Sequence, residues 1–374
     1  MTDDLTTPLT GAKGKTKARR SLPIARILFG LLALIAMAFA ARILMVDDPE
    51  GGRPSQEVAI TSTRNANSVA NTVAEGPVTI TADPQQFPAG AAMTGVTTGA
   101  GGPSSVNGLP DIFGALPDLS EETAAGPIPR ISATGLTPFA AYAHPAGDAV
   151  ASGKPMIAIV VTGLGINEQG SLNAIDALPS ARTLAFAPYG KALSTTVAAA
   201  RTAGHEVLLE VPLEPFDYPQ NDPGPQTLLT GDATRANLDK LFWLMSRFGG
   251  YIGLINNMGA RFTASAADFS PMMEELGARG LGYLDDGSSN RSLAPQLAQG
   301  NNVPYSRADL MIDANPSRAS ILAALASLEA TALEKGAAIG IVSALPISIT
   351  SIADWSRDLE AKGIVLVPAS VLMK

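Results

Sequence analysis

The pattern of hydrophobic positions divides the chain into two unlike parts at about residue 154. After that point, short apolar runs rich in β-branched residues alternate with segments of helical period. Because the runs are apolar throughout, they predict parallel strands that are covered on both faces. The runs span residues 156–161, 183–187, 206–211, 251–255, 282–285, 309–312, 338–343 and 365–368.

Between these runs, apolar side chains recur at the i, i+3, i+4, i+7 spacing of a helix with one buried stripe. The clearest case is the stripe formed by Leu238, Leu241, Phe242 and Met245. Residues 315–317, Asn-Pro-Ser, predict the start of another such helix. Strands alternating with helices predict an α/β fold, a (β/α) barrel, with an open doubly wound sheet as the alternative. In both folds, functional side chains belong on loops at the carboxyl ends of the strands.

The first part of the chain predicts export. A basic tail at residues 1–22 precedes an apolar segment at 23–46, and Asp47 and Asp48 follow it. The positive-inside rule predicts a single transmembrane signal anchor in the bacterial inner membrane with the C-terminal part in the periplasm. The alternative is a signal peptide cleaved after Ala40, because Ala38-Phe39-Ala40 fits the small-x-small pattern. Both alternatives export the rest of the chain.

Residues 47–153 are rich in Gly, Pro, Ala, Ser and Thr. Such a composition buries too little apolar surface to offset the entropy of ordering, and it predicts a flexible, disordered linker. Two apolar islands, 112–116 and 138–142, could dock on the following domain or on a partner, or could be unspecific apolar spots. The expected domain therefore spans residues 154–374.

Composition excludes several kinds of chemistry. The chain has no cysteine, two histidines and a formal net charge of −8. Disulfides, thiolate zinc sites and cysteine nucleophiles are excluded, and the acidic balance argues against a nucleic-acid partner. A site with two imidazoles would need both His144 and His205. His144 lies in the expected linker and His205 precedes a strand, at the end opposite the functional loops.

The ends of the strands supply polar candidates for a cleft. They could ring the mouth of the barrel with hydrogen-bonding groups, and Tyr189, Tyr218 and Tyr283 could add stacking surfaces. Some of these residues could instead serve only the structure. Arg261 could form an ion pair with Asp285 or Asp286, and Asp285-Asp286-Gly287 is a turn sequence. The candidate cleft residues are Thr162, Glu214, Asn257, Arg261, Asp285 and Ser343.

Four motifs in order carry a family resemblance. They are Ile-Ala-Ile-Val-Val-Thr-Gly-Leu-Gly at 157–165, Gly-His-Glu-Val-Leu-Leu at 204–209, Pro-Leu-Glu-Pro at 212–215 and Met-Gly-Ala-Arg-Phe-Thr at 258–263. Together they resemble the divergent polysaccharide deacetylase family of bacterial envelope proteins, over residues 154–374. The resemblance implies the irregular (β/α) barrel of the carbohydrate-esterase deacetylases. In active members of that wider group, one aspartate and two histidines hold a divalent metal and a second aspartate acts as base.

This chain departs from the resembled pattern at those positions. Thr162 and Gly163 stand where the family commonly has Asp-Asp, Asn257 where it has His, and Val342 and Ser343 where it has Gly-His. A bound metal would activate water and polarise the acetamide carbonyl, but hydroxyl and amide side chains are poor zinc ligands. The sequence therefore predicts no metal and no other cofactor.

Three functions remain open. The first is a non-catalytic module that binds cell-wall glycan through the old substrate cleft. The second is a glycan N-deacetylase or hydrolase with a rebuilt site that uses Glu214, Asp285 and Arg261. The third is a scaffold that binds a protein partner of the envelope through the linker and its apolar islands.

Overall fold

The computed structural model describes residues 115–374. The basic tail, the signal anchor and the first part of the expected linker lie outside these residues. Within the described part, no helix is both long and apolar enough to cross a membrane.

A nine-stranded sheet forms the centre of the domain, in the order β8-β7-β6-β5-β4-β3-β10-β9 with β11 beside β3. Every pairing in this sheet is parallel. The strands are β3 (Met156–Leu164), β4 (Thr183–Phe186), β5 (Glu206–Leu213), β6 (Gly253–Met258), β7 (Gly282–Asp285), β8 (Tyr305–Arg307), β9 (Leu310–Met311), β10 (Ala337–Ser343) and β11 (Val365–Leu366).

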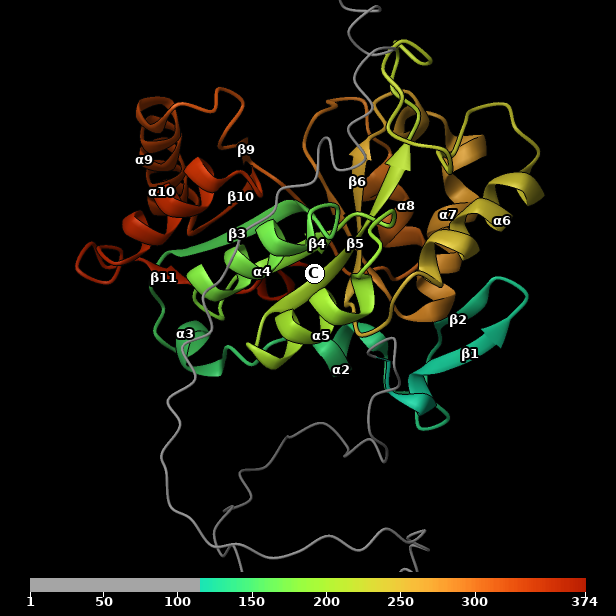
Figure 1. The fold of residues 1–374 in the computed structure, drawn as a ribbon, viewed down its shortest axis with the longest axis horizontal. Coiled ribbons are helices and arrows are strands. Elements are labelled where there is room, and N and C mark those ends of the chain that lie inside the picture. The colour runs from blue at the N-terminus through green and yellow to red at the C-terminus, as the bar shows by residue number, and fades with distance from the viewer. Residues whose placement is uncertain (1–114) are drawn as a thin grey trace, which may run out of the picture. The chain divides into compact units, whose positions relative to one another are not determined.

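The sheet curls into a half-barrel (Figure 1). The predicted alternation of strands and helices is confirmed. The sheet does not close into a full barrel, because the edge strands β8 and β9 pair with β7 and β10 but not with each other. These two edge strands contain only 3 and 2 residues. They offer too little backbone to hydrogen-bond across the remaining gap.

Helices cover the outer face of the sheet. They are α4 (Glu168–Ala177), α5 (Leu193–Thr202), α6 (Thr234–Met245), α7 (Ala266–Arg279), α8 (Ala294–Gly300), α9 (Arg318–Lys335) and α10 (Pro346–Ser356). The helix predicted after Asn315-Pro316-Ser317 is α9, and the Ser317 hydroxyl caps it by accepting from the Ser320 backbone N–H at 3.2 Å. The domain also contains three short 3₁₀ turns, η1 (Pro117–Leu119), η2 (Phe262–Ala264) and η3 (Ala369–Leu372).

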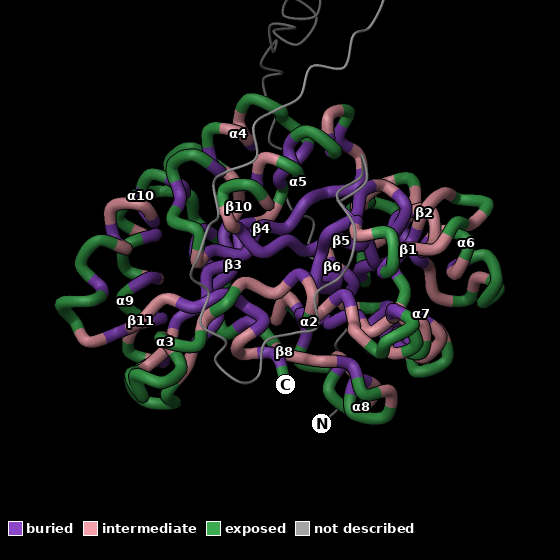
Figure 2. Tube along the Cα trace, turned by 90° about the horizontal axis from the view of Figure 1, so that it is seen from below, coloured by how far each residue is buried: buried purple, intermediate pink, exposed green. Residues whose placement is uncertain are grey.

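The two faces of the sheet pack against different parts of the chain. Outward side chains such as Ile159, Leu209 and Leu254 join the helices in the larger apolar core. Inward side chains such as Val160 and Leu208 form a smaller core with residues from both ends of the domain. Figure 2 shows the buried strands at the centre of a shell of half-buried and exposed helices.

The folded domain begins well before residue 154. Residues 115–153 were expected to be flexible linker, but they form the hairpin of β1 (Ser120–Thr123) and β2 (Gly126–Pro129) and the helices α2 (Pro138–Tyr142) and α3 (Gly147–Ala151). Tyr142 is 4% exposed, and its hydroxyl accepts from the Leu116 N–H at 2.8 Å. Both apolar islands therefore dock on this domain, as far as the structure describes them.

Candidate functional site

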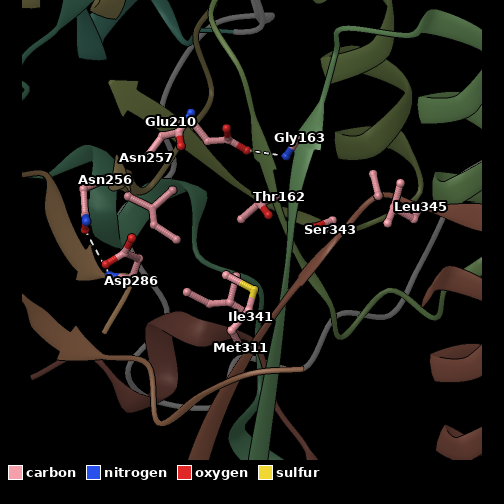
Figure 3. Close-up of a pocket in the computed structure, with 12 residues that line it drawn as sticks. Thr162, Gly163, Glu210, Asn256, Asn257, Asp286, Met311, Ile341, Ser343 and Leu345 are labelled. Carbon is pink, nitrogen blue, oxygen red and sulfur yellow. Dashed lines mark hydrogen bonds between the residues drawn. The ribbon is translucent and has the colours of Figure 1, made fainter. Parts of the chain in front are cut away.

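A cavity of about 340 Å³ opens at the carboxyl ends of the strands (Figure 3). It lies on the inner face of the sheet. Its lining combines hydroxyl, amide and carboxyl groups with an aliphatic wall. The lining residues are Thr162, Gly163, Glu210, Ile255, Asn256, Asn257, Asp286, Met311, Ile341, Ser343, Ala344 and Leu345.

The end of β3 supplies Thr162 and Gly163. The pairing of β3 with β4 shifts register between Val161 and Leu164, so the strand bends where it reaches the cavity. Gly163 has a φ of 79°, a left-handed conformation that glycine adopts without strain. The Thr162 hydroxyl donates to the Val342 carbonyl at 3.2 Å, which ties β3 to β10.

Glu210 reaches the cavity from the middle of β5. Its carboxylate accepts a hydrogen bond from the Gly163 N–H, drawn in Figure 3, and its side chain is 5% exposed. Burial raises the pKa of Glu210 to about 7, although the bond from Gly163 acts in the opposite direction. Sequence reasoning missed this residue because it considered only the ends of strands. The available signal was that Glu210 is an acid in the middle of the apolar run at 206–211. It lies two residues after Leu208, so its side chain is on the same, inward face of the strand.

Two asparagines end β6. Asn256 joins β6 to β7, because its Oδ1 accepts from the Tyr283 hydroxyl at 3.1 Å and from the Asp286 N–H at 3.0 Å. Its Nδ2 donates to the carbonyl of Met258 at 2.7 Å, which supports the left-handed φ of 57° at that residue. The Asn257 side chain makes no hydrogen bond within the described residues and points into the cavity lining.

The acid that lines the cavity after β7 is Asp286, and the predicted Asp285 lies outside it. Adjacent residues of a strand face opposite sides, so Asp285 turns outward and is 1% exposed. One Asp285 oxygen accepts from the Gly287 N–H at 2.9 Å, whereas its Oδ2 is buried without a partner. Burial is the main cause that raises the pKa of Asp286, which accepts from both the N–H and the hydroxyl of Ser288.

Ser343 ends β10, and its orientation depends on Asp313. The Asp313 carboxylate accepts from the Ser343 N–H at 3.0 Å and from the Ser348 hydroxyl at 2.7 Å. This arrangement holds the start of α10 against β10. Asp313 is thus a buried acid with a structural role beside the cavity.

Glu214 and Arg261 lie outside the cavity and pair with each other at 3.1 Å. Arg261 was expected to pair with Asp285 or Asp286 if its role was structural, but its partner in the structure is Glu214. Glu214 also accepts from the N–H and the hydroxyl of Thr230, so the pair holds the loop between β5 and α6. Of the six predicted cleft residues, the structure brings together Thr162, Asn257 and Ser343.

The predicted tyrosine platforms do not line the cavity either. Tyr283 is fully buried in the core, and Tyr189 packs against Trp243 with ring centroids 6.4 Å apart. The apolar part of the cavity is therefore aliphatic, formed by Ile255, Met311 and other lining side chains.

The comparisons with known proteins agree with this fold and these motifs. A family profile described as divergent polysaccharide deacetylase matches residues 159–373. The chain belongs to this family. The chain is similar to the uncharacterised protein ATU2773 of Agrobacterium tumefaciens C58, whose crystal structure is known and whose sequence is 43% identical. That likeness has a TM-score of 0.64 and covers 66% of this chain and 99% of the other.

A second relative is the uncharacterised protein YibQ of Escherichia coli K12, 24% identical over 225 residues, which are 60% of this chain and 68% of that protein. The catalytic domain of a peptidoglycan N-acetylglucosamine deacetylase from Eubacterium rectale ATCC 33656 is 14% identical, with a TM-score of 0.39 over 57% of this chain and 88% of that one. The last likeness is too weak to bear on activity.

The residues of this divergent polysaccharide deacetylase do not fit the metal site of the wider group. In the cavity, the positions expected to hold ligands carry hydroxyl and amide groups, which bind zinc poorly. His205 is buried at the start of β5, with its ring nitrogens 3.3 Å from the carbonyls of Arg182 and Ile175. His144 lines a different hollow, and its backbone N–H donates to Glu206 at the start of β5. Within residues 115–374, no three His, Cys, Asp or Glu residues gather as metal ligands would.

Proposed function

We propose that this protein is a non-catalytic, glycan-binding divergent polysaccharide deacetylase of the bacterial envelope. The observation that carries the proposal is the lining of the cavity at the carboxyl ends of the strands. There, a neutral hydroxyl and a neutral amide stand where the chemistry of active deacetylases would require imidazoles, and two carboxyl groups line the same cavity. The site keeps its place in the fold while the groups that would hold a metal are replaced.

The cavity suits a saccharide because sugar hydroxyls both donate and accept hydrogen bonds. The Asn257 amide offers a donor and an acceptor without a competing bond to the described part of the protein. The Ser343 hydroxyl donates to the Asp313 carboxylate at 3.4 Å and offers its oxygen as an acceptor, and Ile255 and Ile341 form an apolar surface for the face of a pyranose ring.

The proposed place of action is the periplasmic face of the bacterial inner membrane. Residues 23–46 would anchor the chain and the following linker would carry the domain toward the cell-wall glycan. This part of the proposal is supported by the apolar and charged pattern of the sequence.

The test is isothermal titration calorimetry of the full-length protein with N-acetylglucosamine and glucosamine oligomers and with peptidoglycan fragments. We expect Asn257→Leu to weaken binding about tenfold, because it removes hydrogen bonds at nearly constant volume. Asn173→Leu, at an exposed position on α4, is the matched control and should leave binding unchanged. Failure of all three ligands to bind would refute the proposal.

A hydrolase is the second candidate function, and one observation favours it. Glu210 titrates near neutral pH inside the cavity, as a general acid or base must. The rebuilt site would then use Glu210 in place of the predicted Glu214, Asp285 and Arg261, which do not line the cavity. Release of acetate or of new reducing ends from N-acetylglucosamine oligomers, abolished by Glu210→Gln, would favour this candidate over a binding module.

A further inference from the structure

The ionisable groups that line the cavity are all of one kind. The two ionisable residues of its lining are Glu210 and Asp286, and both are acids. Strands β3, β4, β6, β9 and β10, which form most of the inner face around Glu210, carry no ionisable side chain. β7 contributes Tyr283 and Asp285, which turn to the outer face. Arg261 does not line the cavity and is paired with Glu214.

Neither carboxyl group is neutralised by the protein. Glu210 is 5% exposed, and within the described residues its hydrogen-bond partner is the Gly163 N–H, on one of its two oxygens. Asp286 accepts from Ser288 but has no cation near it in the lining. Burial raises the pKa of both groups, and the charge of Asp285 adds to the effect on Asp286. A ligand that brings a positive charge would supply what the protein does not.

We propose that the cavity selects by charge, and binds saccharides that carry a free protonated amino group more tightly than the same saccharides in N-acetylated form. Glu210 and Asp286 are the selecting groups. This inference rests on the proposed glycan-binding function and names its ligand class: the amino sugars that a deacetylation reaction produces.

The chemistry of the two ligand forms differs at one group. An ammonium group donates three hydrogen bonds and can reach the oxygen of Glu210 that the Gly163 N–H leaves without a bond. An N-acetyl group is neutral, and its carbonyl oxygen would be repelled by an ionised carboxylate. The preference should therefore be stronger at pH 7 than at pH 5, where Glu210 is protonated in the free protein.

The experiment is calorimetric titration of the full-length protein at pH 7 with a glucosamine trimer and with an N-acetylglucosamine trimer. We expect the amino trimer to bind about tenfold more tightly, as for one charge-assisted hydrogen bond in a buried site. Glu210→Gln should reduce this preference to about twofold, and Asp286→Asn should reduce it in part.

A control is needed because the chain carries a formal net charge of −8, which attracts cations generally. Glu334→Gln removes one exposed negative charge from α9, away from the cavity, and should keep the full preference. A preference that persists unchanged in Glu210→Gln and Asp286→Asn would reflect general attraction and overturn the inference.

The outcomes also separate this inference from the proposed function. Equal or tighter binding of the N-acetylated trimer would overturn the charge selection and leave glycan binding intact. Binding of neither trimer, nor of peptidoglycan fragments, would overturn both.

Discussion

Two glutamates on the inner face of β5, Glu206 and Glu210, are both buried and yet have opposite surroundings. Glu206, at the base of the sheet, accepts from the His144 N–H, the Thr183 hydroxyl and both the N–H and the hydroxyl of Ser370. Glu210, four residues nearer the carboxyl end, accepts only from the Gly163 N–H among the described residues.

The difference teaches how to separate a structural acid from a candidate ligand group in the same strand. Folding satisfies the buried Glu206 with donors from three separate segments, so its charge holds the base of the domain together. Folding leaves Glu210 desolvated and facing an open cavity, so its charge lowers stability unless a ligand compensates. Residue type and burial alone do not distinguish the two.

Of the substitutions that test this comparison, replacing Glu206 should have the largest effect on stability. We expect Glu206→Ala to lower the free energy of unfolding by about 3–5 kcal/mol, because several buried donors lose their acceptor. Equilibrium unfolding in urea measures the change. Thr183→Val removes one donor to Glu206 and the acceptor of the Ala369 N–H, and should lower it by about 1–3 kcal/mol. A loss below 1 kcal/mol in Glu206→Ala would show that this network does not hold the base.

The pH dependence of stability tests whether the Glu210 carboxyl group is desolvated, as the comparison with Glu206 implies. The folded pKa of about 7 lies above the ordinary glutamate pKa of 4.5, which applies to the unfolded chain. The folded protein therefore binds this proton more tightly, and the stabilisation is complete below pH 4.5 and is lost as the pH rises through 7. Glu210→Gln should remove about 2–3 kcal/mol of the decrease in unfolding free energy between pH 5 and pH 8.

Urea unfolding of the wild type and Glu210→Gln at several pH values isolates this effect, because all other groups titrate in both proteins. Glu334→Gln, at an exposed position, should follow the wild-type pH profile. Parallel profiles for wild type and Glu210→Gln would mean that the carboxyl group is not desolvated.

The sequence predicted the central strands of the sheet better than its edge strand β8 and the N-terminal limit of the domain. Eight apolar runs correspond to β3–β7 and β9–β11, because a strand covered on both faces must be apolar throughout. The missed β8 is Tyr305-Ser306-Arg307, a polar edge strand without such a run. Residues 115–153 were missed because their short elements are stabilised by docking on the domain, which leaves no periodic pattern in the sequence.

For the candidate site, the position of a residue in its strand could be predicted, but its partners could not. Thr162, Asn257 and Ser343 were found because parallel strands end at one edge and those side chains turn inward. Adjacent strand residues face opposite sides, so Asp285 and Asp286 could not both face the cleft, but the sequence did not say which of them turns inward; the structure places Asp286 in the lining. The pairing of Glu214 with Arg261 and Thr230 depends on how a long loop folds back, and no local pattern encodes it.

Glu214, the third acid of this series, gives the smallest expected effect. Its partner Arg261 has a side chain that is 50% exposed, so water screens their attraction. We expect Arg261→Ala to lower the free energy of unfolding by less than about 1 kcal/mol and to leave saccharide binding unchanged, because the pair lies outside the cavity. Urea unfolding and the glucosamine trimer titration measure both effects. A loss of binding in a stable Arg261→Ala protein would extend the site to the loop after β5, and would make Glu214 resemble Glu210 more than Glu206.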